Sequence, residues 1–477
     1  MPSPTDPDAS SLSRLIHSHE LSCREVMQAT LARIHERNPR FNAIVSLAPD
    51  DALLAQADAY DAELAQGRSR GWLHGIPVAI KDVADAVGFP STKGCELLAN
   101  NMPVRDSVMT ARMKAAGCIV IGKTNVPELG LGSHTFNNVF GATHNAWDPA
   151  VSAGGSSGGA AVALAQRMLC IADGSDFMGS LRNPAGWNHV FGMRPTQGRV
   201  PNGTNPDVWI DQLATEGPMA RTVQDLGRLL ATQSGPDARA PLSFQSTLDW
   251  SPQPAEPAAL RGLRIGWLGS LGGYLPMEDG VLDVCRDALK HFESAGAAVE
   301  EIPLGRDPAP LWECWLTWRR ALVGSRVDPL LKLPQAREKI KPEALWEYDT
   351  SRELSFADFM RASQVRSSFY QHLRGLFEQW DVLVLPSAQV WPFDVNLRWP
   401  QRVGEHAMDT YHRWMEVTIY ATLAGVPGLC VPAGFHANGR WPMGIQLIGK
   451  HGADAFLLRV AAAYEALRAD FMRLRPG

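Results

Sequence analysis

An alternation of short β-branched runs with helical patterns is the feature that most constrains the fold of this chain. Residues 75–80 and 119–121 are apolar runs bounded by glycine, as buried strands usually are. Residues 108–116 and 160–168 carry apolar side chains at helical spacing. Because strands and helices take turns along the sequence, we predict an α/β fold.

The two ends of the chain add further elements. Apolar residues recur at helical spacing within residues 11–37, which predicts two amphipathic helices. Ser22 stands three positions before Glu25, the pattern of an N-cap with a capping box, so the second helix is expected to begin there. In the second half of the chain, residues 263–268 and 298–302 predict two strands, and residues 280–295 predict the helix between them, which makes a β-α-β unit. Two more buried strands are predicted at residues 380–386 and 428–432.

Composition excludes several classes of protein. The 477 residues carry a formal net charge of only −5 with both signs interspersed, so nothing predicts binding to nucleic acid or to a membrane surface. No apolar run is long enough to span a bilayer, and residues 1–8 do not resemble a signal peptide. Seven scattered cysteines without metal-type spacing predict reduced, buried thiols, so we expect a cytoplasmic protein.

A glycine- and serine-rich block gives the strongest indication of chemistry. Residues 154–159 read Gly-Gly-Ser-Ser-Gly-Gly, and a second glycine-preceded serine, Ser180, follows downstream. Lys81 ends the apolar run of residues 75–80. A serine hydroxyl needs an adjacent base to become a nucleophile, and a desolvated lysine can supply one. The sequence therefore predicts a serine hydrolase whose base is Lys81.

This constellation resembles the amidase signature family, whose members hydrolyse carboxylic amides. Residues 122–125, 424–427 and 444–449 are also similar to family landmarks in the family's order, so the resemblance covers nearly the whole chain. It implies a large mixed β-sheet flanked by helices, an α/β/α sandwich. It also implies an amidohydrolase that uses no metal or cofactor and binds a small amide, with a homodimer left open.

The resemblance implies a role for each catalytic side chain. Ser180 would attack the amide carbonyl, Ser156 would relay the proton, and neutral Lys81 would receive it. For that purpose the pKa of Lys81 must fall far below its solution value of about 10.4, and desolvation is the expected cause. From the sequence alone an alternative stays open, in which the Lys81 ammonium pairs with Asp82.

The segment before the nucleophile departs from the family pattern. Family members commonly read Asp-Thr-Gly-Gly-Ser, whereas residues 176–180 read Asp-Phe-Met-Gly-Ser. The implied oxyanion donors are backbone N–H groups of Phe177, Met178 and Gly179. Because Met178 replaces a glycine, a positive φ there would be uncommon, and we expect its side chain to project toward the acyl pocket as a specificity element.

Three supporting features complete the expected site. An ion pair between Asp176 and Arg182 is expected to brace the loop. Ser157 is expected to support the catalytic groups, and the resemblance implies a cis peptide bond between Gly155 and Ser156.

The resemblance also implies how one domain, residues 1–477, is divided. Residues 11–65 would form N-terminal helices and residues 70–233 the catalytic core. Residues 234–258, rich in Pro, Ala, Ser and Asp, predict a surface connection. Residues 259–477 would hold the β-α-β unit and the wall of the substrate funnel.

Two other motifs compete with this interpretation. Residues 117–124 match the Walker A pattern, but the residues between its glycines predict a buried strand where a phosphate site needs a loop that opens into a helix. Residues 154–158 match the G-x-S-x-G nucleophile elbow, which would make Ser156 the nucleophile, but no apolar strand precedes them.

Tryptophan is concentrated in the last third of the chain. Eight of the fifteen tryptophans lie between residues 312 and 414. An aromatic wall would favour a hydrophobic or aryl amide, although any single tryptophan can equally belong to the core. Two alternative functions stay open: the glutaminase subunit of a tRNA-dependent amidotransferase, and a non-catalytic amidase-like protein in which Met178 is the lesion.

Overall fold

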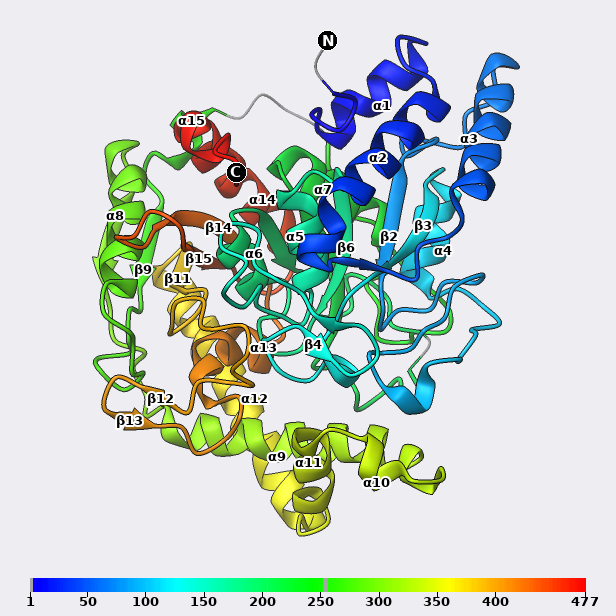
Figure 1. Ribbon diagram of the computed structural model, residues 1–477. Coiled ribbons are helices and arrows are strands. Elements are labelled where there is room, and N and C mark those ends of the chain that lie inside the picture. The colour runs from blue at the N-terminus through cyan, green and yellow to red at the C-terminus, as the bar shows by residue number, and fades with distance from the viewer. Residues whose placement is uncertain (1–2, 204, 252–255) are drawn as a thin grey trace.

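An eight-stranded mixed β-sheet forms the centre of the computed structural model, which describes residues 3–203, 205–251 and 256–477 (Figure 1). Its strands, in spatial order, are β10 (Ala298–Glu301), β9 (Arg264–Trp267), β11 (Val382–Pro386), β15 (Pro442–Ile448), β14 (Gly428–Phe435), β7 (Phe191–Arg194), β8 (Thr215–Ala220) and β6 (Ile171–Asp176). β10, β9 and β11 are parallel, and the other neighbouring pairs are antiparallel. The expected large mixed sheet is confirmed.

Helices cover both faces of this sheet. One face packs against α7 (Val223–Gln233), α8 (Val281–Ser294) and α14 (Asp454–Leu467), which also contact one another in part. The other face packs against α5 (Gly158–Ala165) and α6 (Arg182–Asn188). The molecule therefore has the expected α/β/α layers.

A smaller sheet brings the predicted lysine strand to the main sheet. Its order is β1 (Ile44–Val45), β3 (Ile119–Thr124), β2 (Pro77–Lys81), with β2 parallel to β3. Every residue of β2 and β3 is buried, as expected for an apolar run covered on both sides. β2 also contacts β6, so Lys81 lies where the two sheets meet.

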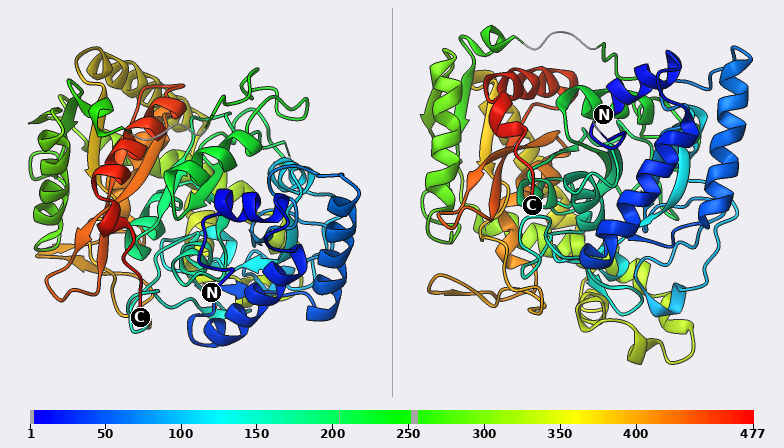
Figure 2. Two further views of the ribbon diagram at one scale, coloured as in Figure 1. Left: turned by 90° about the horizontal axis from the view of Figure 1, so that it is seen from above. Right: turned by 45° about the horizontal axis from the view of Figure 1, so that its top comes forward.

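The N-terminal helices group beside the smaller sheet, as both views in Figure 2 show. They are α1 (Ala9–His17), α2 (Cys23–Phe41) and α3 (Asp50–Ala65). Ser22 caps α2 and forms the predicted capping box with Glu25. Two N-terminal helices were expected, and α1 and α2 confirm them.

The strand-helix-strand unit β9-α8-β10 is confirmed, with its strands parallel and adjacent. The structure assigns no helix or strand to residues 234–251 of the expected surface connection, while residues 252–255 lie outside the described part.

A group of four helices extends from the main sheet toward the lower part of Figure 1. These are α9 (Ala309–Val327), α10 (Ala336–Lys339), α11 (Pro342–Ser351) and α12 (Phe356–Gln379). α9 packs against both α11 and α12. Trp312, Trp315 and Trp318 lie on successive turns of α9, and all three are buried.

The remaining elements are short. They are α4 (Val108–Ala115), α13 (Ile419–Ala424), α15 (Ala469–Met472), the pairs β4 (Phe136–Asn137) with β5 (Gly141–Ala142) and β12 (Arg402–Val403) with β13 (His406–Ala407), and the 3₁₀ turns η1 (Glu96–Leu98), η2 (Glu128–Gly130), η3 (Pro257–Leu260), η4 (Leu330–Lys332) and η5 (Arg413–Thr418). Each of the seven cysteines is buried with a free thiol. Among the described residues, no helix is both long and apolar enough to cross a membrane.

The close packing of α5 on β3 gives a stability prediction. A Cβ atom at Gly159 would lie 2.4 Å from the backbone nitrogen of Asn125 and 2.6 Å from the carbonyl oxygen of Ala43. Since neither backbone group can rotate away, Gly159→Ala should lower the free energy of unfolding by about 1–3 kcal/mol, measured by urea denaturation.

Gly375→Ala is the matched control, because Gly375 lies inside α12 and its Cβ would meet nothing within 4 Å. That change should leave stability equal or raise it by up to about 1 kcal/mol. Equal unfolding midpoints for the two variants would contradict the packing argument.

Candidate active site

Lys81 stands at the centre of a cluster of hydroxyl groups. Its Nζ lies 2.9 Å from Ser156 Oγ and 2.8 Å from Ser157 Oγ. It also lies 3.0 Å from Ser175 Oγ and 3.2 Å from the Ser175 carbonyl oxygen. The lysine side chain is fully buried. The structure therefore brings together three of the predicted residues and adds Ser175.

The alternative pairing of Lys81 with Asp82 is wrong. The Asp82 carboxylate accepts hydrogen bonds from the Thr92 hydroxyl and the Gly94 N–H, and it lies 3.9 Å from Lys123 Nζ. Lys123 also donates to the Ala84 carbonyl at 2.5 Å. Lys123 belongs to a buried strand, so the Walker A match at residues 117–124 is not a phosphate loop.

Burial changes the proton affinity of Lys81. Desolvation lowers the pKa of Lys81 to about 7, although nearby Asp173, Asp176 and Glu216 oppose the change. Asp173 accepts the backbone N–H of Lys81 at 3.1 Å, and burial raises the pKa of this carboxyl to about 6. Burial likewise raises the pKa of Glu216 to about 8. A large fraction of Lys81 is therefore neutral near pH 7 and able to accept a proton.

The glycine-serine block has the conformation that the resemblance implied. The peptide bond between Gly155 and Ser156 is cis. Gly154 has a φ of +75°, and a Cβ atom there would lie 2.5 Å from Asn183 Oδ1. Ser157 immediately precedes α5. Position 154 thus requires glycine for two reasons: its φ is positive, and Asn183 leaves no room for a side chain.

Asp176 and Arg182 form the expected buried ion pair. Arg182 Nη2 lies 2.9 Å from Asp176 Oδ1, and Arg194 Nη1 lies 3.7 Å from the same oxygen. The carboxylate also accepts the N–H of Gly179 at 2.8 Å and of Leu181 at 3.2 Å. Burial alone would raise the pKa of Asp176, but these charges and donors hold it at about 2.

These bonds change the set of candidate oxyanion donors. The Gly179 N–H is occupied by Asp176, whereas within the described residues the N–H groups of Phe177, Met178 and Ser180 have no hydrogen-bond acceptor. Ser156 and Ser180 are only 4% and 5% exposed, so both side chains are buried. Within the described residues, Phe177, Met178 and Ser180 thus carry the free N–H groups at and just before Ser180.

Gly179, not Met178, has the positive φ. Its φ is +83°, and a Cβ atom there would lie 2.6 Å from Thr418 Cγ2. Met178 is 5% exposed and belongs to the apolar core. The loop therefore keeps its glycine where the backbone requires one, and Met178 does not have a positive φ.

Phe177 joins the loop to helix α9. Its ring centroid lies 5.3 Å from that of Trp315, and the guanidinium groups of Arg319 and Arg326 lie 5.2 and 5.5 Å from the Phe177 ring. These contacts bring part of the tryptophan-rich segment beside the loop of residues 176–180, called the Ser180 loop below.

Sequence reasoning missed Ser175, Asp173 and Arg194. Ser175 and Asp173 alternate in β6, a buried strand, and polar side chains in such a strand were the signal that could have found them. Arg194 ends β7 and carried no local signal, because its contact with Asp176 depends on the pairing of strands.

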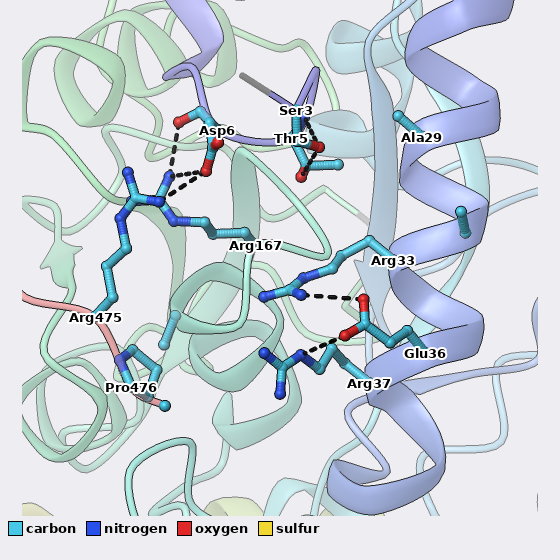
Figure 3. Close-up of a pocket in the computed structure, with 13 residues that line it drawn as sticks. Ser3, Thr5, Asp6, Ala29, Arg33, Glu36, Arg37, Arg167, Arg475 and Pro476 are labelled. Atoms are coloured by element: carbon cyan, nitrogen blue, oxygen red, sulfur yellow. Dashed lines mark hydrogen bonds and ion pairs between the residues drawn. The ribbon is translucent and has the colours of Figure 1, made fainter. Parts of the chain in front are cut away.

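An open cavity of about 640 Å³ shares no residue with this site (Figure 3). Arg33, Arg167 and Arg475 line it, and Asp6 and Glu36 pair with them. Within the described residues, no three His, Cys, Asp or Glu side chains gather in a way that could hold a metal ion.

Comparison with known proteins agrees with this geometry. The Amidase family model matches residues 25–458. The chain therefore belongs to the amidase family, hydrolases of carbon–nitrogen amide bonds. An acylamidase from Rhodococcus erythropolis is 33% identical over 465 residues, which cover 96% of this chain and 95% of the relative.

Two other similarities bear on the substrate. A glutamyl-tRNA(Gln) amidotransferase subunit from Thermosynechococcus vestitus is 34% identical over 477 residues, which cover 95% of this chain and 96% of that protein. The crystal structure of a bacterial aryl acylamidase of the amidase signature family superposes with a TM-score of 0.90 at 28% identity, covering 98% of this chain and 97% of the other.

The ion pair between Asp176 and Arg182 at the Ser180 loop gives a second prediction. Asp176→Asn removes the charge that compensates buried Arg182 and Arg194, so it should lower the free energy of unfolding by about 3–5 kcal/mol. Asp349→Asn removes an exposed ion pair with Arg337 and should cost less than about 1 kcal/mol. Chemical denaturation of both variants measures the difference, and similar small losses would contradict the bracing role.

Proposed function

We propose that the protein hydrolyses a small carboxylic amide through an acyl-enzyme on Ser180, with Ser156 and Lys81 as the proton relay. The observation that carries the proposal is the contact between a buried lysine of lowered pKa and Ser156 Oγ, 2.9 Å away. A base must be neutral at the working pH and in contact with the group it deprotonates.

In the proposed acylation step, Ser180 Oγ forms a bond to the amide carbonyl carbon. Its proton passes to Ser156 Oγ, whose own proton passes to the neutral Lys81 amine. When the carbon–nitrogen bond breaks, the Lys81 ammonium returns a proton through Ser156 to the leaving nitrogen. Water then attacks the acyl-enzyme by the same route and releases the acid and Ser180.

The negative charge on the carbonyl oxygen would be stabilised by backbone donors. The N–H groups of Phe177, Met178 and Ser180 are the proposed donors, because within the described chain they are free of internal acceptors. Rigid donors of this kind contribute about 10²–10³ in rate each. Asp176 supports them by fixing Gly179 and Leu181 on either side of the nucleophile.

We propose a hydrophobic or aryl group in the substrate. Phe177 and Trp315 lie together at the Ser180 loop, and Met178 adds an apolar side chain within it. The acylamidase relative and the aryl acylamidase structure support this class. Met178 would narrow the acyl pocket.

The second candidate is a glutaminase subunit of a tRNA-dependent amidotransferase. The identity of 34% to a glutamyl-tRNA(Gln) amidotransferase subunit favours it as much as the acylamidase relative favours the first. A non-catalytic role has less support, since Lys81, Ser156 and Ser157 form an intact hydrogen-bonded cluster and Met178 does not require a positive φ.

A substrate panel tests the proposal. Wild-type protein, Ser180→Ala and Ser367→Ala would be assayed on aliphatic amides, anilides and glutamine by measuring released amine or ammonia. Ser367 is exposed on α12 and serves as the control. We expect anilide hydrolysis that Ser180→Ala lowers by about 10³-fold or more and Ser367→Ala leaves unchanged. Hydrolysis of glutamine alone would favour the amidotransferase function. Full activity in folded Ser180→Ala would show that Ser180 is not the nucleophile.

The pKa of Lys81 predicts a pH profile. Lys81 must be neutral to act as the base, so kcat/KM should be low below pH 7, rise through about pH 7 and level off above it. The Asp173 carboxylate opposes the fall in the Lys81 pKa, so Asp173→Asn should move the rise to lower pH. Asp349→Asn, an exposed control, should not move it. A flat profile from pH 6 to 8, or a rise that moves to higher pH in Asp173→Asn, would contradict Lys81 as the base.

A further inference from the structure

The open cavity in Figure 3 is lined by arginines that come from several parts of the chain. It has a volume of about 640 Å³ and lies between α2, the turn after α5, and the segments of residues 3–6 and 475–477. Arg33 and Arg37 reach it from α2, whereas Arg167 and Arg475 reach it from two other segments. Guanidinium groups from separate walls therefore face one space.

The α2 wall of the cavity has donors to spare. Arg33 donates from Nε to the Gln166 carbonyl and from Nη1 to Glu36, which leaves Nη2 free among the described residues. Arg37 Nε lies 3.3 Å from a Glu36 oxygen, but it is buried and no described residue accepts a hydrogen bond from it. Because buried polar groups are nearly always hydrogen-bonded, this unused donor indicates a missing acceptor.

The other wall repeats this pattern. Arg167 Nη1 donates to the Asp6 carbonyl at 2.7 Å, and Arg475 Nη1 donates to the Asp6 carboxylate at 2.8 Å. In the part of the chain that the structure describes, the Nε and Nη2 groups of both arginines have no acceptor. A guanidinium carries five N–H donors and no acceptor, so both walls present surplus donors to the cavity.

Positive charge exceeds negative charge around the cavity. Four guanidinium groups line it, against the carboxylates of Asp6, Glu36 and the last residue of the chain, Gly477. Asp6 and Glu36 are each shared by two arginines. Burial first, and then the charges of neighbouring arginines, lowers the pKa of Arg167 to about 10. The field in the cavity therefore attracts an anion.

A phosphate group matches these donors better than a carboxylate does. A carboxylate has two oxygens in one plane, which suits the fork of a single guanidinium. A phosphate group carries about −1.5 to −2 charges at pH 7 and has three strong acceptor oxygens. It can therefore accept hydrogen bonds from both walls at once.

The size of the cavity favours a small molecule. Its volume of about 640 Å³ falls within the range of roughly 300–1,000 Å³ that is typical of small-molecule pockets. The formal net charge of the whole chain is −5, which disfavours a long polyanion such as a nucleic acid.

The cavity is also separate from the catalytic cluster. α5 begins directly after Ser157, and Arg167 lies beyond its other end. The eight residues of α5 span about 12 Å at 1.5 Å per residue. A ligand at Arg167 would therefore not compete with an amide at the catalytic serines.

We propose that the cavity is a binding site for a phosphate group, either free or as the monoester of a small molecule, held by Arg33, Arg37, Arg167 and Arg475. This site does not depend on the proposed amide hydrolysis, because its residues take no part in the reaction.

Binding is tested by isothermal titration calorimetry with inorganic phosphate at constant ionic strength. The double variant Arg37→Gln/Arg475→Gln removes one arginine from each wall and should weaken binding by about tenfold or more. Arg374→Gln removes an exposed arginine of α12 that pairs with Glu378, and as the matched control it should bind as the wild type does. No binding by the wild type, or equal binding by the folded double variant, would overturn the site.

Acetate separates phosphate recognition from general attraction of anions. At the same ionic strength, acetate should bind to the wild type about tenfold more weakly than phosphate, because it has one charge and two oxygens. Equal affinities for acetate and phosphate would overturn the assignment to a phosphate group.

Ribose 5-phosphate separates the two sources of the phosphate group. Tighter binding than that of inorganic phosphate, lost in the double variant, would identify a monoester whose remaining atoms occupy the rest of the cavity. Binding no tighter than that of inorganic phosphate would assign the site to free phosphate and overturn the monoester.

Discussion

The burial of one lysine is the constraint on which the site depends. Lys81 ends a strand at the junction of two sheets, where its amine meets three serines and no water-exposed surface. Desolvation disfavours the ammonium form, and the nearby carboxylates only partly restore it. The two-sheet architecture thus gives Lys81 the lowered proton affinity that the proposed chemistry needs.

A second constraint fixes the Ser180 loop. Asp176 is buried with Arg182 and Arg194, and it binds two backbone N–H groups around Ser180. The bonds hold the loop while leaving other N–H groups free. Because removing either charge would strand the other in the interior, the loop and the main sheet stabilise one another.

The helices α9 to α12 lie outside the central layers, yet they contact the site. Phe177 packs on Trp315, and Tyr411 binds both Arg319 and Glu347 beside it. The two sheets hold Lys81 and its serines, and α9 contacts the Ser180 loop through Trp315 and Phe177. The proposed reaction type depends on Lys81 and its serines. The proposed substrate class depends on the apolar side chains beside Ser180, among them Phe177 and Trp315.

The sequence by itself determined the α/β class, the capped helix α2 and strands β2, β3, β9, β10, β11 and β14, because hydrophobic periodicity and capping patterns are local signals. The resemblance to the amidase signature family implied that Lys81, Ser156 and Ser157 belong to one site. Only the tertiary structure decided that Asp82 belongs to Lys123, that Arg194 joins Asp176, and that the Gly179 N–H is occupied. Each of these contacts joins residues through strand pairing or loop conformation, which local patterns do not encode.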